Sequence, residues 1–307
     1  MKQINSKTLW REIKRNKQIY ILLLPVVLWY AVFHYGPMYG AVIAFKDFKP
    51  ALGISDSSWA GFKHFVAFFN DLYFGRLIRN TILISLYQII FSMPAAIVFA
   101  LFVNEIRSLK FKKVVQTVSY LPHFISMVVV CGMLVDFLSS DGIITQFLSI
   151  FGLPETNLLM IPEYYRTIHV TSGIWQTMGW SSIVYLSALT SIDQEQYEAA
   201  SLDGASRLQK MRYITLPGLT PTITIMLIMK VGQVMSVGYE KIILLSNSVT
   251  WETAEVISSY VYRTGLADAY PRFSYSAAIG LFQSLINMVL VLTANKVCKK
   301  LNGSGLW

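Results

Sequence analysis

Long runs without charged residues divide the chain into apolar segments separated by more polar loops. A helix needs about 20 mostly apolar residues to cross a bilayer core, and five runs free of Asp, Glu, Lys and Arg are at least that long. A sixth run begins at Tyr213, is interrupted by Lys230 and then resumes. We therefore predict six transmembrane helices, which cover about residues 18–45, 80–104, 114–138, 167–192, 213–245 and 273–297.

The remaining segments predict a single all-α membrane domain that covers residues 1–307. Residues 1–17 form a basic tail, and the apolar segment that follows is longer than the core of a signal peptide, so we expect a retained first helix. The loop 139–166 is too apolar for a plain solvent loop and is broken by glycines and prolines. We expect it to form short helices at the membrane interface or folded back into the protein.

Composition supports a membrane protein and sets its orientation. The chain is 54% hydrophobic and only 14% charged, whereas soluble domains carry about a quarter charged residues. Sixteen basic residues lie in the N-terminal tail and in clusters at 107–113, 207–212 and 296–300. This distribution follows the positive-inside rule, so we expect both termini in the cytoplasm. It also explains the net charge of +9 without a nucleic-acid partner.

Cysteine and histidine give no sign of a metal site or a disulfide framework. Cys131 and Cys298 are the only cysteines, and each lies in or beside an apolar run. The four histidines are scattered, without a pair at metal-ligand spacing. We expect no metal and no cofactor bound by this chain.

The loop 193–217 is predicted to carry a short helix with a face of small residues. Asp193 and Gln196 have the form of a capping box, and we expect Pro217 and Gly218 to stop the helix before the next span. A helix that lies on a membrane displays large apolar residues and a basic polar face. This one offers mainly alanine, glycine and serine, which favours close docking into a protein cleft.

The loop carries three groups of residues at fixed spacing: Glu198-Ala199-Ala200, then Gly204 after three residues, then Ile214-x-Leu216-Pro217 after nine more. At every defined position this pattern resembles the EAA motif of ABC importer permeases. In that family the loop forms a coupling helix that sits in a groove of the ATP-binding subunit. The resemblance implies that two copies of a cytoplasmic ATPase are coupled through Glu198, Ala199, Ala200, Asp203, Gly204, Ala205, Ile214, Leu216 and Pro217.

The subunit that binds ATP is predicted from a motif that this sequence lacks. The chain has no G-x-x-x-x-G-K-[ST] segment of its own. We expect ATP and Mg to be bound by the partner ATPase subunits, and this chain to be a non-catalytic permease.

Four further segments carry a resemblance to a narrower family: FHYGPMYGAVIAFKDFKP at 33–50, Trp59-Ala60-Gly61-Phe62, Asn80-Thr81, and VGYEKIILLSN at 237–247. They resemble the carbohydrate-uptake permeases of the lipoprotein/polysaccharide type. The resemblance implies a bacterial plasma-membrane protein that moves a complex oligosaccharide. It further implies an extracellular solute-binding lipoprotein and a second, homologous permease as partners.

Polar and aromatic residues in the fourth and fifth spans are candidates for the substrate pathway. Seven residues, about two helical turns, separate Gln233 from Glu240, so we expect them on one helix face. Gly232 and Gly238 would permit close packing or a local break in that helix. Polar groups are costly in lipid and should face protein or water. The candidates are Trp175, Gln176, Trp180, Gln233, Ser236, Tyr239 and Glu240.

Alternative interpretations remain open at this point. Tryptophan and tyrosine also populate membrane interfaces, and Glu240 with Lys241 would equally mark the outer membrane boundary. An ABC importer permease for an amino acid, a peptide or an ion fits the coupling motif as well. An ion channel or secondary carrier would need titratable groups inside several spans, whereas five of the six predicted spans have none.

Overall fold

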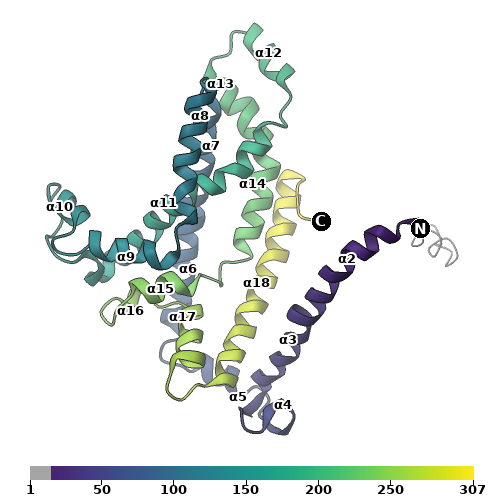
Figure 1. The fold of residues 1–307 in the computed structure, drawn as a ribbon, viewed down its shortest axis with the longest axis vertical. Coiled ribbons are helices and arrows are strands. Elements are labelled where there is room, and N and C mark those ends of the chain that lie inside the picture. The colour runs from purple at the N-terminus through teal and green to yellow at the C-terminus, as the bar shows by residue number, and fades with distance from the viewer. Residues whose placement is uncertain (1–14) are drawn as a thin grey trace.

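The computed structural model describes residues 15–307, most of them in helices (Figure 1). Most of the predicted basic tail, including Lys2 and Arg11, lies outside the described residues. The label η marks 3₁₀ or π-helical segments. In chain order the elements are α2 (Lys17–Tyr30), η1 (Ala31–Tyr35), α3 (Gly36–Met38), η2 (Tyr39–Phe45), β1 (Lys46–Lys49), α4 (Gly53–Asp56), β2 (Ser57–Trp59), α5 (Lys63–Phe69), α6 (Phe74–Tyr87), η3 (Gln88–Ser92), α7 (Met93–Glu105), α8 (Leu109–Tyr120), η4 (Leu121–Phe124), α9 (Met127–Phe137), α10 (Ile143–Ser149), η5 (Leu158–Met160), α11 (Pro162–Leu189), α12 (Gln194–Leu202), α13 (Arg207–Lys210), η6 (Met211–Thr215), α14 (Leu216–Val231), α15 (Tyr239–Leu245), α16 (Trp251–Ala254), α17 (Ile257–Tyr262), η7 (Arg263–Ala267) and α18 (Phe273–Asn302).

Four continuous helices within the described chain are long and apolar enough to cross a membrane: Lys17–Phe45, Phe74–Glu105, Arg207–Val231 and Phe273–Leu301. A bent helix pair over residues 109–137 would make a fifth. The 28 residues of α11 match the predicted fourth span in length, but its serines, threonines, Gln176 and His169 make it more polar. The predicted all-α membrane fold is confirmed, and six crossings are compatible with these helices.

The predicted third span is not one straight helix. Its two parts, Leu109–Phe124 and Met127–Phe137, meet at an angle of 95°. Pro122 has no N–H for a helical hydrogen bond, and the Ser126 side chain accepts a hydrogen bond from the Val129 N–H, which starts α9 as a new helix. In Figure 1, α9 and α10 accordingly extend sideways from the bundle instead of continuing along it. In the expected apolar loop 139–166, α10 and η5 are the short helices that the sequence predicted.

The predicted fifth span is also divided. Its helix ends at Val231, residues 232–238 form a non-helical segment, and α15 starts at Tyr239. A Cβ atom on Gly232 would collide with the Val291 side chain of α18. Glycine therefore permits the close approach of the two helices where α14 ends, and the local break is the one that Gly232 and Gly238 predicted.

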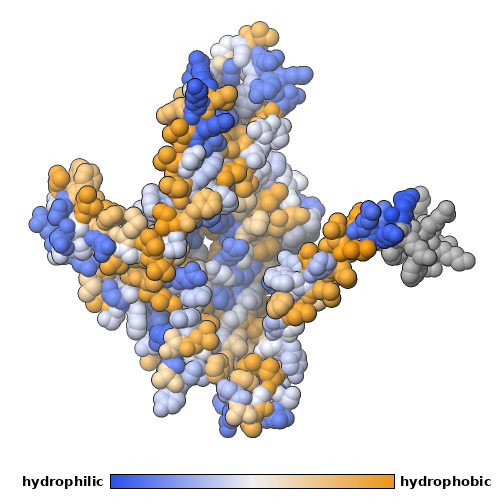
Figure 2. All heavy atoms as spheres, in the orientation of Figure 1, coloured by the Kyte–Doolittle hydropathy of each residue, from blue (hydrophilic) through white to orange (hydrophobic). Residues whose placement is uncertain are grey.

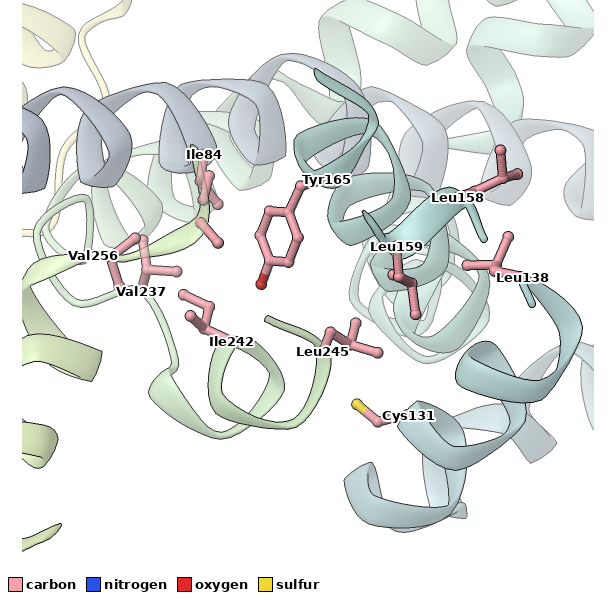
Figure 3. Packing of buried hydrophobic residues seen from close by; sticks show 11 residues of the cluster. Ile84, Cys131, Leu138, Leu158, Leu159, Tyr165, Val237, Ile242, Leu245 and Val256 are labelled. Atoms are coloured by element: carbon pink, nitrogen blue, oxygen red, sulfur yellow. The ribbon is translucent and has the colours of Figure 1, made fainter. Parts of the chain in front are cut away.

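The core lies where α6, α9, α11 and the α15–α17 region meet. The ring of Tyr165 is enclosed there by apolar side chains from several elements, among them Ile84 and Ile242 (Figure 3). Nearer α12, Ala96, Tyr185 and Leu219 are buried where α7, α11 and α14 pack together. The chain is thus held together by α11, which lies at the centre of both regions.

The end of the molecule opposite α12 carries a small sheet that the sequence did not predict. Strands β1 and β2 pair antiparallel, with Lys46 opposite Trp59. From this end the apolar helix α2 extends away from the bundle (Figures 1 and 2), and none of its residues is buried.

A candidate coupling loop and transport pathway

The predicted short helix of the loop is present as α12, but other residues than predicted start and end it. The Asp193 side chain accepts a hydrogen bond from the Glu195 N–H, so it caps the helix without Gln196. A capping box is formed instead by Ser206 and Gln209, where the next helix starts. Pro217 does not stop α12, because α12 ends well before it; Pro217 lies just after the π-helical segment η6, inside the continuous helix Arg207–Val231.

The stop is Gly204. Its φ is +75°, in the left-handed region that glycine adopts without steric cost. The Ala205 N–H donates to the Ala200 carbonyl at 2.9 Å, and the Gly204 N–H to the Ser201 carbonyl at 3.1 Å. These two bonds are those of a Schellman motif. The spacing between the alanine pair and Gly204 is therefore the spacing that ends a helix and turns the chain.

The surface of α12 is open. The helix has no buried residue, and Leu202 is 90% exposed. It lies at the tip of the molecule, beyond α13 and α14 (Figure 1), in a region with many hydrophilic side chains (Figure 2). Glu198, Ala199, Asp203 and Gly204 are exposed, and Ala200 and Ala205 are partly exposed. The face of α12 that carries the small residues is therefore accessible from outside the molecule.

Side-chain contacts attach α12 to the start of the next long helix. The Tyr197 hydroxyl lies 3.0 Å from the Thr215 hydroxyl, and the Lys210 ammonium donates to the Ser201 hydroxyl at 2.5 Å. Of the three motif residues at the helix start, Ile214 is partly exposed, while Leu216 and Pro217 are exposed. The helix from Arg207 to Val231 is continuous over 25 residues. One continuous helix therefore connects the contacts of α12 with the far end of α14.

That far end is the non-helical segment 232–238, whose backbone groups are bound by side chains of neighbouring helices. Ser85 donates to the Val234 carbonyl at 2.5 Å. The Asn287 side-chain carbonyl accepts from the Met235 N–H at 3.0 Å, and its amide donates to the Ser236 hydroxyl at 2.8 Å. Gln283 donates to the Met235 carbonyl. Non-helical backbone at membrane depth is stable only with such partners.

The four pathway candidates of the fifth span do not share a helix face, so that part of the prediction is wrong. The break places Gln233 and Ser236 on the non-helical segment and Tyr239 and Glu240 on α15. Gln233, Ser236 and Glu240 are exposed. Tyr239 is 39% exposed, and its ring stacks on Tyr262 at 5.1 Å.

The three candidates of the fourth span have different surroundings. Gln176 is buried and donates to the Ile125 carbonyl at 3.4 Å, so it binds a backbone group freed by the bend between α8 and α9. Trp180 stacks on His123 at 4.7 Å. Trp175 lines an apolar cavity of about 720 Å³ between α9, α10 and α11. A pathway role for these residues stays a prediction.

Of the neighbours Glu240 and Lys241, the structure leaves Glu240 exposed and buries Lys241. Its ammonium donates to the His169 carbonyl of α11 at 2.8 Å, and its exposed fraction is 7%. The sequence left open whether Lys241 marks the membrane boundary, and only the structure shows that its ammonium is buried against a backbone carbonyl, as a buried lysine requires.

Asn80 and Thr81 connect α6 to the segment that precedes α17, at the end of the molecule opposite α12. Asn80 is fully buried, and its amide donates to the Glu252 carbonyl at 2.8 Å and to the Glu255 carbonyl at 3.0 Å. Thr81 accepts from the Ile257 N–H at 3.1 Å. The Glu255 carboxylate is buried between Arg76 and Arg263. Polar side chains thus tie α6 to the segment that precedes α17.

No metal centre is visible in this arrangement. Within residues 15–307, no group of three or more His, Cys, Asp and Glu side chains is close enough to hold a metal ion.

Comparison with known proteins agrees with the loop motif and the fold. Residues 65–301 match the family model described as binding-protein-dependent transport system inner membrane component. The chain is 39% identical over 307 residues to the polygalacturonan/rhamnogalacturonan transport system permease protein YteP of Bacillus subtilis (strain 168), with coverage of 100% of this chain and 95% of YteP.

Two solved structures of a bacterial alginate ABC transporter also match. One, described as involved in the import of the acidic polysaccharide alginate, has 43% identity and a TM-score of 0.86, and covers 96% of this chain and 99% of its own. The other is a complex with a periplasmic protein that holds an alginate pentasaccharide. It has 42% identity and a TM-score of 0.87, and covers 97% and 99%. The chain belongs to the family of inner membrane components of binding-protein-dependent transport systems, the permeases of ABC importers.

Proposed function

We propose that this chain is the permease subunit of an ATP-driven importer that moves a complex oligosaccharide into the cytoplasm. An extracellular solute-binding protein delivers the oligosaccharide, and a second, homologous permease completes the membrane pathway. Two copies of a cytoplasmic ATPase bind ATP and Mg, and this subunit has no catalytic role. In this arrangement both termini face the cytoplasm.

The observation that carries the proposal is the exposed α12 with its Schellman turn at Gly204. Its small residues permit close approach, and Leu202 supplies an apolar contact. The Tyr197–Thr215 contact joins it to α14. An importer needs two global states whose balance both ATP and substrate can shift, and α14 with the break at residues 232–238 supplies an element that connects the two ends.

The relatives support an oligosaccharide as cargo. YteP is a polygalacturonan/rhamnogalacturonan permease, and the solved alginate transporter is seen with a pentasaccharide-bound periplasmic protein. Both matches extend over nearly the whole chain, including the helices that would surround the cargo.

Gly204→Trp tests the coupling role. We expect this substitution to abolish co-purification of the ATPase subunit and oligosaccharide uptake, because it adds bulk to the docking surface and strains a positive φ. Gly303 is a matched control, since it also ends a helix with φ of +67° and has no atom within 4 Å of an added Cβ. Gly303→Trp should leave both activities unchanged. Intact ATPase association and uptake in Gly204→Trp would show that α12 is not the docking element.

The cargo is tested with the cognate solute-binding protein and a panel of glycans, amino acids and peptides. We expect tight binding of an oligosaccharide by calorimetry, and stimulation of ATP turnover when the loaded protein is added to the reconstituted importer. Binding of amino acids or peptides alone would exclude an oligosaccharide importer while leaving the coupling mechanism intact.

A further inference from the structure

A small pocket lies between α15, α16 and α17, in the half of the molecule away from α12 (Figure 1). Its volume is about 240 Å³, which is below the roughly 300–1,000 Å³ of pockets that enclose a drug-sized ligand. The pocket is therefore of a size to hold one ring of a longer ligand. Its lining includes Ser246, Asn247, Trp251, Ser259, Tyr262 and Arg263.

Two aromatic rings form part of the pocket wall. Trp251 is 39% exposed, and the Arg263 guanidinium lies 5.1 Å from the centroid of its ring. The Tyr262 ring is partly buried and stacks on Tyr239, with 5.1 Å between the ring centroids. Each ring is thus held by a neighbour while it lines the pocket, so little side-chain freedom is lost when a ligand packs against it.

Hydrogen-bonding groups without a partner lie beside these rings. The Ser246 and Tyr262 hydroxyls make no hydrogen bond within residues 15–307. Arg263 donates to Oε1 of Glu255 through Nε at 2.9 Å and through Nη2 at 2.7 Å, so its Nη1 still has N–H groups to offer. Arg76 binds the other oxygen of Glu255. The groups of the lining that remain open to a ligand are therefore hydroxyls and N–H donors.

We propose that this pocket is a subsite for one sugar ring of the oligosaccharide as it enters the permease. A sugar ring has an apolar face of C–H groups that packs on aromatic rings, and a rim of hydroxyls that donate and accept hydrogen bonds. Trp251 and Tyr262 match the apolar face, and the Ser246 hydroxyl and Arg263 Nη1 match the rim. The inference rests on the proposed function and extends it by naming where this subunit contacts the cargo.

The position of the subsite connects it to the break at the end of α14. The pocket wall includes Ile242 and Ile243 of α15, and α15 starts directly after the non-helical segment 232–238. A sugar bound here contacts the element that follows the break. If the pocket differs between the two states of the importer, the bound sugar shifts their balance.

The test uses the reconstituted importer with its ATPase, partner permease and solute-binding protein. Two quantities are measured in proteoliposomes: the half-saturating concentration of loaded binding protein for uptake, and the affinity of the unloaded binding protein for the importer. Trp251→Leu should raise the first about tenfold, which equals about 1.4 kcal/mol, and leave the second unchanged. Leucine keeps apolar volume but has no flat ring. Trp251→Phe keeps a ring and should stay within about twofold of the wild type.

Tyr262→Phe tests the polar side of the pocket. It keeps the ring and removes the hydroxyl, so the half-saturating concentration of loaded binding protein should rise about threefold. Tyr270→Phe is its control, because Tyr270 is 87% exposed and lies outside the pocket lining. Trp59→Leu is the control for Trp251→Leu on the same grounds. Both controls should leave the two quantities unchanged, and the ATPase should co-purify with every variant.

Two outcomes would overturn the subsite. One is an unchanged half-saturating concentration in both Trp251→Leu and Tyr262→Phe. The other is an equal loss of affinity for loaded and unloaded binding protein, because the pocket would then hold a side chain of that protein instead of a sugar.

Failure of the proposed function would look different. If the wild-type importer takes up no oligosaccharide from a loaded binding protein, the proposed function itself is wrong. If the wild type takes up the oligosaccharide and Trp251→Leu does so with the same half-saturating concentration, the proposed function stands and this subsite is excluded.

Discussion

At the scale of single residues, several polar side chains act as fixed points between segments far apart in sequence. Asp71 is the acceptor for three donors: the Tyr275 hydroxyl at 2.5 Å, the Tyr260 hydroxyl at 2.7 Å and the Tyr73 N–H at 2.9 Å. Burial by itself raises the pKa of Asp71, but these hydrogen bonds outweigh it and hold the pKa below its ordinary value.

The depressed pKa of Asp71 predicts a loss of stability in acid. The carboxylate contributes fully above its unfolded pKa of about 4, and the contribution is lost as the pH falls through the lower folded value. We expect the thermal midpoint of the purified protein in detergent to fall from pH 7 to pH 3. Asp71→Asn should reduce the free energy of unfolding at pH 7 by about 1–3 kcal/mol and so lower the thermal midpoint. It should also reduce the fall of the midpoint toward pH 3. Asp56→Asn, at an exposed site, should retain the wild-type pH profile.

Glu255 gives a second prediction at this scale. Its carboxylate is 4% exposed on the side chain and is shared by Arg76 and Arg263. Glu255→Gln removes the negative charge and leaves two guanidinium groups beside a neutral amide, at a cost of about 3–5 kcal/mol. The exposed Glu252 provides the same substitution without an ion pair among the described residues. Equal melting temperatures for Glu255→Gln and Glu252→Gln would contradict the role of this ion network.

At the scale of elements, the break after α14 is the feature that most changes the view of the pathway. A continuous helix would place Gln233 and Glu240 on one face. Instead, Gly232 ends α14 against α18, and Ser85, Gln283 and Asn287 bind the freed backbone groups. The segment 232–238 is thus stabilised by these tertiary contacts in addition to local backbone turns, such as the hydrogen bond from the Ser236 N–H to the Gln233 carbonyl at 2.8 Å.

Asn287→Leu tests this element. It leaves the Met235 N–H without its acceptor and the Ser236 hydroxyl without its donor, so we expect a loss of about 1–3 kcal/mol in stability. Faster hydrogen exchange of the amides in 232–238 should accompany it. Thr293→Val on the same helix is the control, since Thr293 bonds only to carbonyls of α18. Unchanged exchange in the Asn287 variant would show that the segment does not depend on this clamp.

At the scale of the whole molecule, α14 connects the exposed loop to the break. Its continuous helix, from Arg207 to Val231, is about 37 Å long at 1.5 Å per residue. One end is attached to α12 through Thr215 and Tyr197. The other reaches the segment clamped by α6 and α18.

Tyr197→Phe should therefore weaken coupling without preventing assembly. It removes one hydroxyl and keeps the ring, so the ATPase should still co-purify, while uptake per ATP hydrolysed falls several-fold in proteoliposomes. Tyr213→Phe is the control, because Tyr213 is 70% exposed and makes only a ring contact with Arg212. An unchanged ratio of uptake to hydrolysis would show that the Tyr197 contact does not transmit force.

Sequence alone was sufficient for the membrane class, the all-α fold and the family, because these depend on local patterns. Charge-free runs measure helix length against bilayer thickness, and the motif from Glu198 to Pro217 has a fixed spacing. The structure gives that spacing a physical cause, since Gly204 ends α12 by its positive φ. A helix end that depends only on neighbouring residues can be predicted from the sequence.

Only the tertiary structure decided where helices bend and which polar groups meet. The bend after Phe124 depends on Gln176, 51 positions away from Ile125, and the end of α14 depends on Val291 and Asn287 of α18. The start of α11 and the segment before α17 meet because the Asn80 side chain binds both. Such contacts join residues far apart in the chain, so their energies leave no periodic signal in the sequence.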